Sequence, residues 1–494
     1  MGVKAMISRN TVVHPWLRTV KVAFIPGPMD SALQQTTEGV LNYLRNAGHS
    51  VVNIPDNETD AIITTAYFGH LIDWRTSLMV TARRKYGLRH NPTVFTYVSI
   101  PEDEFQRHLK RFDQFVRDPA PNPRDYQFPG LAPEAYQVLY EQGKRGGPIL
   151  ALERLIQAQT KSLRVVLIVV GRRGIKEAYH FDLAGAYPRT KANDLDYFYE
   201  DIALRMVTAL STKEVTNHEV VDDPIPRSVW DSLTTPSAMI RAAQELNRRN
   251  FFTEMVVIPK LVHMPAVGDA VARQYSEGCF ATYDPVLRGL VSTVTGSARP
   301  VDKGNISEDD LAVIIGVKPT GDGALVRHVQ GKRNDPPSSE AVEMMDMDRA
   351  LPSLILDSSW GINEPVPMAR SKLHGHRGVA SYHPAYVEFA PLDAPYYDYL
   401  VSCATQAQAW GIKQAFSRSE ALRNPSDPRQ VVFTVLPGHG VVIVEKWVRG
   451  KAPFEVILNY MDAGHLEIVS PIPQGRFTYV PSPSGRMVLQ LQDE

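Results

Sequence analysis

The sequence predicts an α/β fold in which two open, largely parallel α/β layers are followed by a β-rich, antiparallel barrel-like C-terminal domain. Up to about residue 290, short apolar runs alternate with amphipathic helical patterns, which is typical of parallel α/β layers. Beyond it, strand-like runs come with many Gly and Pro residues and few helical patterns, which favours antiparallel β-structure. A chain of 494 residues is also too long for one ordinary core. We therefore expect three domains, at residues 1–125, 126–290 and 291–494.

The first domain is expected to begin with a strand at Lys21 that runs into a Pro-Gly-Pro loop. Apolar residues at helical spacing predict a helix over residues 31–47, which Gly48 ends. The remaining predicted elements are strands at residues 50–54, 60–65 and 93–98 and a helix at residues 71–85. The loops after these strands would lie at the edge where open α/β sheets bind ligands. Because no GxGxxG or Walker sequence occurs there, a nucleotide site is unsupported.

The second domain is expected to continue this alternation after a Pro-rich connection at residues 118–130. The predicted elements are a helix at residues 134–158 interrupted between Gly143 and Pro148, a strand at 163–170, helices at 197–210 and 235–250, a linker at 220–226, and a strand that begins at Met255. Two arginines between Gly171 and Gly174 indicate either an anion-binding turn or a solvated one.

The C-terminal domain is predicted from a series of short strands. They are expected at residues 311–317, 324–329, 379–382, 386–390, 430–436, 440–447 and 454–458. Only residues 399–421 have a firmly helical pattern. We therefore expect a mainly antiparallel barrel or sandwich with one or two helices.

Composition limits the possible classes of function. The formal net charge of -1 leaves no surplus of Lys and Arg to neutralise phosphates, which argues against a nucleic-acid scaffold. Two cysteines, Cys279 and Cys403, are too few for a disulfide framework and are expected to be free thiols in a reducing compartment. The chain has no apolar signal core at its start and no apolar run near the ~20 residues that span a bilayer. We therefore expect a cytoplasmic protein with no nucleic-acid or membrane partner.

The densest group of polar residues lies in the stretch Arg273–Pro300, around a short apolar segment. Glu277 and Asp284 precede the apolar run, and Arg299 and Lys303 follow it beside a loop of small residues. Such crowding is typical of a binding or catalytic site. The alternative is a helix N-terminus in which Asp284, placed before a proline, serves as a cap.

Four histidines of the C-terminal domain are candidate ligands. His374 and His376 are two residues apart, so on a strand they would face the same side and could converge on one ion or one anion. His383 follows in a Ser-Tyr-His-Pro sequence. His439 lies between two glycines just before a predicted strand, so the backbone can bring its imidazole close to a ligand. The alternative for each is a structural histidine.

Acidic residues upstream supply possible oxygen ligands. Glu277 with an Asp and a His would form a mixed oxygen and nitrogen site, which suits manganese, iron or magnesium better than zinc–thiolate chemistry. Asp309 and Asp310 could instead cap the segment that follows them. Arg333, in a loop that starts with Gly331, could hold a phosphate or carboxylate, and a solvated loop is the alternative.

The order of two α/β layers and a β-rich domain resembles the L-fucose and L-arabinose isomerase superfamily. Three short motifs are similar to motifs of that family: Ser276-Glu-Gly-Cys279 to its acidic segment, Ala380-Ser-Tyr-His383 to its histidine strand, and Leu436-Pro-Gly-His439-Gly to its late glycine-flanked histidine. The second acidic ligand has no matching motif, and Asp309 takes that place from its order along the chain. The resemblance thus implies Glu277, Asp309, His383 and His439 as ligands of a divalent metal, with Mn²⁺ as the expected ion.

The same resemblance implies an aldose–ketose isomerisation through an enediol, with Glu277 and Asp309 as catalytic carboxylates. Arg299, Lys303, Arg333 and His376 are expected to bind the carbohydrate substrate. The implied assembly is a homo-oligomer with sites near subunit boundaries. The alternatives are a non-catalytic carbohydrate-binding or regulatory protein of the same fold and, third, a metal-dependent hydrolase or lyase.

Overall fold

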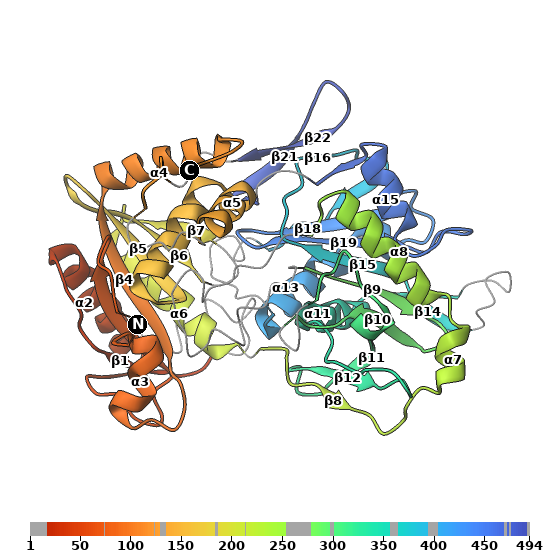
Figure 1. Ribbon diagram of the computed structural model, residues 1–494, viewed down its shortest axis with the longest axis horizontal. Coiled ribbons are helices and arrows are strands. Elements are labelled where there is room, and N and C mark those ends of the chain that lie inside the picture. The colour runs from red at the N-terminus through yellow and green to blue at the C-terminus, as the bar shows by residue number, and fades with distance from the viewer. Residues whose placement is uncertain are drawn as a thin grey trace. The chain divides into compact units, whose positions relative to one another are not determined.

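The computed structural model describes residues 17–73, 75–122, 124–128, 135–182, 186–212, 214–252, 278–296, 301–355, 364–393, 404–468, 472–473 and 476–491 (Figure 1). These residues belong to two compact units. The first unit takes in the described residues up to 212, and the second takes in those from 214 onward. The domain boundary expected at residue 125 falls inside the first unit, and the one expected at residue 290 falls inside the second.

The first unit is built on a seven-stranded sheet in the order β2-β1-β3-β4-β5-β6-β7. Its strands are β1 (Lys21–Phe24), β2 (Ser50–Val52), β3 (Ala61–Tyr67), β4 (Thr93–Pro101), β5 (Arg164–Gly171), β6 (Gly174–Phe181) and β7 (Ala186–Lys191). The first five run parallel, whereas β6 and β7 extend the sheet antiparallel. Strand β4 is buried from Val94 to Ile100, as expected of a parallel strand covered on both faces.

Helices cover both faces of this sheet (Figure 1). They are α2 (Ser31–Asn46), α3 (Leu78–Tyr86), α4 (Glu102–Arg117), α5 (Ala135–Thr160) and α6 (Leu195–Ser211). One apolar cluster, with Leu33 and Phe198, packs α2 and α6 against the sheet. Another, with Phe112 and Leu155, packs α4 and α5. The predicted interruption of the long helix is confirmed, because Gly147 has a φ of 75° and Pro148 follows it.

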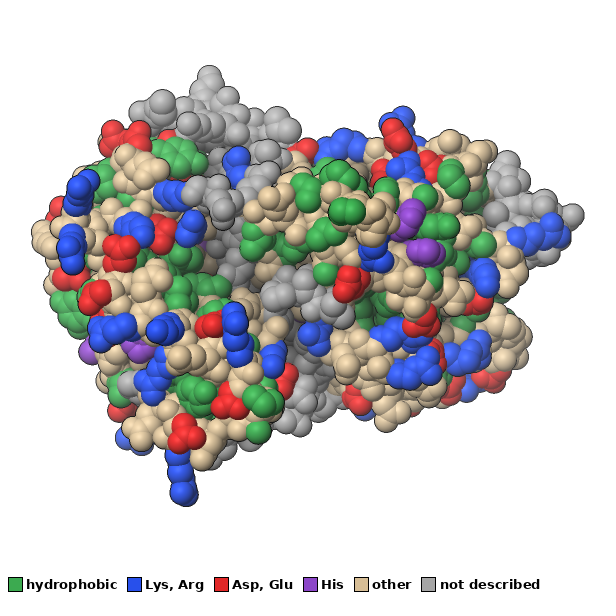
Figure 2. Space-filling view, turned by 90° about the horizontal axis from the view of Figure 1, so that it is seen from above, with side chains coloured by type: hydrophobic (Ala, Val, Ile, Leu, Met, Phe, Trp, Pro, Cys, Tyr) green, Lys and Arg blue, Asp and Glu red, His purple; other side chains and the backbone are tan. Residues whose placement is uncertain are grey.

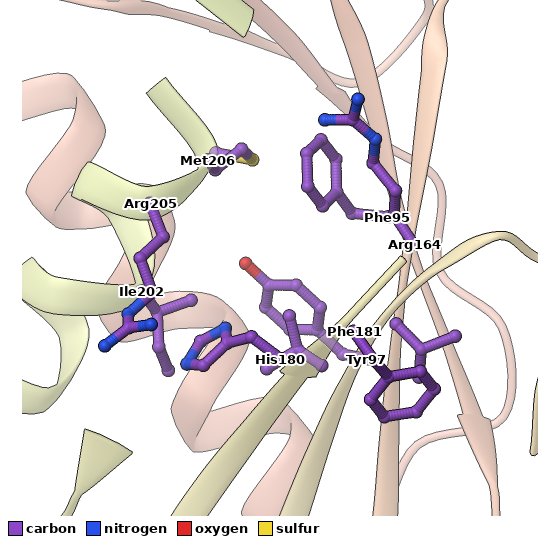
Figure 3. Close-up of a pocket in the computed structure, with 10 residues that line it drawn as sticks. Phe95, Tyr97, Arg164, His180, Phe181, Ile202, Arg205 and Met206 are labelled. Atoms are coloured by element: carbon purple, nitrogen blue, oxygen red, sulfur yellow. The ribbon is translucent and has the colours of Figure 1, made fainter. Parts of the chain in front are cut away.

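The first unit also buries a polar cluster beside a small cavity of about 10 Å³, where Figure 3 shows His180 and Arg205. The Nε2 of His180 lies 2.9 Å from the hydroxyl of Thr190, which in turn donates to Asp201. Because that hydroxyl donates its proton to Asp201, it accepts from His180, which carries its proton on Nε2. Arg205 donates to Asp201 at 2.8 Å, and both side chains are 3% exposed. Burial and the charge of Arg205 lower the pKa of His180 well below its ordinary value.

The second unit is built on a nine-stranded sheet in the order β17-β18-β19-β15-β9-β10-β11-β12-β8. Its strands are β8 (Glu219–Val220), β9 (Cys279–Asp284), β10 (Gly289–Thr293), β11 (Leu311–Val317), β12 (Ala324–Arg327), β15 (Ala369–Gly375), β17 (Val387–Phe389), β18 (Val431–Leu436) and β19 (Gly440–Lys446). Neighbouring strands are antiparallel except for the outermost pair at each end.

Smaller sheets and several helices surround this sheet. A four-stranded sheet has the order β20 (Leu466–Glu467), β16 (Ser381–Tyr382), β22 (Met487–Leu491) and β21 (Phe477–Pro481), and β13 (Ser353–Ile355) pairs with β14 (Pro365–Pro367). The helices are α7 (Arg227–Ser232), α8 (Thr235–Arg248), the 3₁₀ helix η1 (Glu308–Asp310), α11 (Ser339–Asp348), α13 (Gln406–Ser417), α14 (Glu420–Arg423) and α15 (Glu455–Asp462). Helix α11 packs through Met344 on the sheet face that carries Cys279 and Ala281.

The predicted fold class is confirmed, with a parallel-rich sheet between helices followed by a β-rich C-terminal region. The strand predicted at residues 454–458 is wrong, because this run begins helix α15. Its start is held by Glu445 of β19, whose carboxylate accepts from the backbone N–H groups of Phe454, Val456 and Ile457. This tertiary cap outweighs the local strand pattern. The strand expected at Met255 lies outside the described residues.

Two surface properties bear on the expected partners. Within the part of the chain that the structure describes, no helix combines the length and apolarity needed to cross a bilayer. On the face seen in Figure 2, acidic and basic side chains are interspersed, in keeping with the formal net charge of -1.

Candidate metal centre

Three buried histidines of the second unit, His374, His376 and His439, lie together, and we call them the histidine trio. Each offers one ring nitrogen, and these ligand atoms all lie within 4.8 Å of one another. The ring centroids are 5.0, 4.9 and 4.8 Å apart. The three imidazoles therefore form a nearly equilateral triangle.

Two adjacent strands bring the trio together. His374 lies near the end of β15, and His376 follows this strand directly. Strand β19 pairs antiparallel with β15, with Val442 opposite His374, and His439 directly precedes β19. The Nε2 atoms of His374 and His376 lie 3.1 Å apart, which confirms that these two histidines face the same side.

Glycines allow the backbone to approach the trio closely. A Cβ on Gly440 would lie 2.2 Å from the carbonyl oxygen of Gly375, and one on Gly278 would lie 2.7 Å from that of His374. Gly278 also has a φ of 93°, which favours glycine. The Gly-His-Gly sequence around His439 is therefore explained on its C-terminal side by steric exclusion of any larger residue.

The hydrogen bonding of His374 is typical of a metal ligand. Its Nδ1 lies 3.0 Å from the carbonyl oxygen of Val441, so Nδ1 carries the proton and donates to that oxygen. A ligating histidine usually donates its remote N–H to a carbonyl or carboxylate, which fixes the tautomer and the ring orientation. This bond presents Nε2 of His374 toward the other two imidazoles.

The trio fits a transition-metal ion in its spacing and its donor set. Two nitrogens that each lie ~2.1 Å from one ion, at the tetrahedral angle, are separated by ~3.4 Å. The Nε2 atoms of His374 and His376 lie 3.1 Å apart, a few tenths of an ångström closer than this and within hydrogen-bond distance of each other. Three imidazoles with a fourth position left to water or substrate are one of the ligand sets of catalytic zinc sites.

Fixed charges of both signs lie next to the trio. Glu340, in the first turn of α11, accepts a hydrogen bond from the hydroxyl of Ser338 at 2.8 Å. Burial disfavours its carboxylate, but His374 in its protonated, metal-free form, the Ser338 hydroxyl and the ammonium group of Lys303 outweigh this and lower the pKa of Glu340 to about 2. Lys303 itself is 3% exposed. The site thus combines three imidazoles with an ionised carboxylate and a buried ammonium group.

Cys279 lies on β9 opposite His374 and is fully buried. Burial, followed by the negative charge of Glu340, raises the pKa of its thiol well above the ordinary value. Its sulfur lies 3.9 Å from the sulfur of Met344. Cys279 is therefore a protonated core thiol and no activated nucleophile, which confirms the expected free thiol. Cys403 lies outside the described residues.

A buried ion pair fixes α11 beside β15. Lys372, two residues before His374, donates to Asp348 at 2.8 Å, and the two side chains are 0% and 6% exposed. Burial raises the pKa of Asp348 to about 6 and lowers the pKa of Lys372. Because Lys372 and His374 face the same side of β15, this pair holds α11, and with it Glu340, over the trio.

The structure brings three of the predicted site residues to this centre. His376 and His439 belong to the trio. The charge of Lys303 acts on Glu340 and on Cys279, both of which adjoin His374. Lys303 was expected to bind substrate, and that role stays a prediction.

Two further predicted residues, Asp309 and Arg333, have other partners. Asp309, in η1, accepts from the backbone N–H of Arg333 at 3.2 Å, while Asp310 supplies the expected cap by accepting from the N–H of Ser307 at 2.7 Å. The side chain of Arg333 is 55% exposed and pairs with Asp335.

The ring of His383 lies beside Tyr386 and His465, at 5.0 and 5.8 Å between centroids. Among the described residues the trio is the one group of three or more potential ligands, and neither Asp309 nor His383 belongs to it.

Two predicted residues, Glu277 and Arg299, lie outside the described residues. Conversely, Glu340 was not expected at the site. The signal that could have found it is the sequence Ser338-Ser-Glu340 before an apolar run at helical spacing, which is typical of a helix start.

Comparison of the chain with protein-family models, with curated proteins and with solved structures finds no match. The function therefore has to be argued from the geometry of the site.

Proposed function

We propose that the chain is a divalent-metal-dependent enzyme whose ion is held by His374, His376 and His439. The observation that carries this proposal is the convergence of three buried imidazoles with their ligand nitrogens within 4.8 Å. One divalent cation can accept a nitrogen lone pair from each of the three imidazoles. The carbonyl of Val441, which orients His374, supports the same conclusion.

The surroundings of the trio suit chemistry on an oxygen-rich substrate. A bound ion would supply Lewis-acid polarisation of a carbonyl or hydroxyl oxygen. The Glu340 carboxylate, ionised at neutral pH, accepts a hydrogen bond from a substrate hydroxyl. The buried ammonium group of Lys303 stabilises negative charge that develops on a substrate oxygen.

The reaction that we propose is aldose–ketose isomerisation of a small carbohydrate through an enediol. This step rests on the resemblance of the sequence around His439 to L-fucose and L-arabinose isomerases. An open-chain sugar offers a carbonyl and a neighbouring hydroxyl to one ion, which suits a site with an open position beside three imidazoles. The competing proposal is a non-catalytic protein of the same fold, in which the trio is a structural group and needs no ion.

The identity of the ion depends on a fourth protein ligand. Three imidazoles by themselves suit zinc, iron, copper or nickel. A carboxylate from Glu277 would shift the preference toward manganese, the ion that we propose for the isomerase. Activity inside the cytoplasm and assembly as a homo-oligomer belong to the same proposal.

Metal content of the purified full chain tests the metal centre. We expect about one divalent ion per chain after reconstitution and removal of excess ion, and near-complete loss of it in His439→Ala. The matched control is His383→Ala, which removes a histidine outside the trio and should keep the ion. A wild-type chain that retains no Mn²⁺, Zn²⁺, Fe²⁺, Co²⁺, Ni²⁺ or Cu²⁺ would overturn the proposal.

The reaction is tested by incubating the reconstituted protein with a panel of pentoses and hexoses and following ketose formation by NMR. Ketose formation that disappears in His439→Ala and persists in His383→Ala supports the isomerase. A metal-loaded chain that converts none of the sugars would exclude isomerisation of those sugars while leaving the metal centre intact.

A second candidate, a metal-dependent hydrolase, is favoured by the all-nitrogen character of the trio, which matches zinc hydrolytic sites. Hydrolysis of ester or amide probes by the zinc form, without sugar isomerisation by the manganese form, would select it.

A further inference from the structure

The first unit contains a pocket of about 210 Å³ beside the carboxyl end of β1. Its walls come from the loop after β1, from β3 and β4, from α3 with the loop that precedes it, and from the turn between α5 and β5. This is an edge at which open parallel sheets bind ligands, since the connections from β1 and β3 leave on opposite faces of the sheet. The pocket is formed by the first unit alone.

The floor of the pocket changes from apolar to polar along one face of the sheet. Ile62 of β3 and Val94 of β4 pack with Ala82 of α3 in a small apolar cluster. Two residues further on, at positions that face the same side, Thr64 and Thr96 line the pocket instead. A floor needed only for packing would continue the apolar pattern, whereas hydroxyl groups can donate to a bound oxyanion.

The loop after β1 approaches β3 so closely that only glycine fits. A Cβ on Gly27 would lie 2.1 Å from the carbonyl oxygen of Thr65. The backbone N–H of Gly27 donates to the hydroxyl of Thr65 at 3.0 Å, and both residues line the pocket. The loop wall is therefore held by a specific contact and leaves the neighbouring space open.

The charged and titratable residues on the walls are cationic or neutral. Lys85, Lys161 and His70 line the pocket, and none of the described lining residues is Asp or Glu. The Nδ1 of His70 is buried and has no hydrogen-bond partner among the described residues. Lys161 is 8% exposed, its ammonium group donates to the carbonyl oxygen of Ala158, and burial lowers its pKa against the opposing influence of Asp73. A buried ammonium group is stabilised by an anion placed beside it.

We propose that this pocket binds a small phosphorylated molecule through its phosphate group. Lysines recognise phosphate as point charges and hydroxyls donate hydrogen bonds to it, and the described lining residues include no carboxylate that would repel it. The volume corresponds to about seven water molecules at ~30 Å³ each. That space holds a phosphate with a few attached carbons and excludes a dinucleotide. The proposal is independent of the metal centre.

Calorimetric titration of the full chain tests the proposal with inorganic phosphate and glycerol 3-phosphate as probes and succinate as the carboxylate comparison. We expect saturable binding of the phosphate probes and at least tenfold weaker binding of succinate. Lys161→Met should weaken glycerol 3-phosphate binding by about tenfold or more, because it removes a charge-assisted contact in a desolvated place. Lys85→Gln should weaken it by about threefold, because this lysine is largely exposed.

The matched control is Arg84→Gln, which removes a charge from an exposed residue of the same helix outside the pocket. It should leave the Kd unchanged within twofold. Thr64→Val keeps the shape of the floor and removes a hydroxyl, so it remains informative if Lys161→Met fails to fold. The proposal is overturned by an absence of saturable phosphate binding, by succinate binding as tightly as phosphate, or by equal Kd values in Lys85→Gln, Thr64→Val and wild type.

Discussion

At the residue scale, the close approach of two backbone segments makes Gly440 a strongly constrained position beside the histidine trio. Gly440→Ala would place a Cβ 2.2 Å from the carbonyl oxygen of Gly375, so β15 and β19 would have to separate. We expect a loss of about 2 kcal/mol or more in unfolding free energy, measured by denaturant titration, together with weaker metal binding. Gly316→Ala in β11 is the control, because its Cβ would meet only a leucine methyl at 3.5 Å. Equal stability of the two variants would contradict this account.

A second residue-scale prediction concerns the buried polar cluster of the first unit. Asp201→Asn removes the anionic partner of Arg205 while both side chains are 3% exposed. Breaking one side of a buried ion pair typically costs ~3–5 kcal/mol, and we expect a loss in that range. Asp196→Asn, at an exposed position in the first turn of the same helix, should cost at most ~1 kcal/mol. A small loss in Asp201→Asn would show that Arg205 finds another partner.

The spacing of residues along the sequence predicted those features of the site that depend only on local backbone geometry. The two-residue separation of His374 and His376 predicted that they face the same side, and the glycines around His439 predicted a close backbone approach. The presence of Glu340 near these histidines was not predictable in the same way. Glu340 reaches the trio because α11 lies over β15, and no local pattern specifies which helix covers which strand.

At the element scale, the first unit followed its sequence pattern closely because its strands pair in a local order. Helix α2 was predicted within a residue of its bounds, with Leu33, Val40, Leu41 and Leu44 buried at helical spacing. In the second unit, β9, β15 and β19 are neighbours although long stretches of chain separate them. Such pairing depends on complementary faces that single segments do not reveal, and the capped start of α15 was missed for the same reason.

The contact between α11 and β15 gives a prediction at this scale. Lys372→Met leaves the Asp348 carboxyl buried without its cation, so we expect a loss of ~3 kcal/mol in unfolding free energy. The double variant Lys372→Met/Asp348→Leu removes both buried polar groups and should recover most of that loss. Denaturant unfolding of the two single variants and the double variant forms the test. A double variant as unstable as the sum of the two single variants would mean that the pair contributes no coupling.

At the scale of the whole molecule, each unit contains buried or partly buried histidines whose pKa values lie below the ordinary value. Burial is the largest cause for His49, His108 and His180 in the first unit and for His218 in the second. In the unfolded chain these residues titrate near ~6.5. Below that pH the unfolded chain binds more protons than the folded protein, so stability falls as pH decreases.

This imbalance predicts an acid-sensitive chain in which His180 makes a large contribution. Its stabilising effect is present above pH ~6.5 and is lost as pH falls from there toward its lowered folded-state pKa. Each unit of pH below ~6.5 should cost up to ~1.4 kcal/mol for a histidine that stays neutral in the folded state. Denaturant unfolding at pH 7.5, 6.5 and 5.5 should therefore show a midpoint denaturant concentration that falls with pH.

His180→Gln, which keeps a donor for Thr190 but does not titrate, should flatten that pH dependence while losing stability at pH 7.5. His383→Gln replaces a histidine of the second unit and should leave the slope of the first unit's transition unchanged. If His180→Gln kept the full wild-type slope, the acid sensitivity would have to arise from groups other than this buried imidazole.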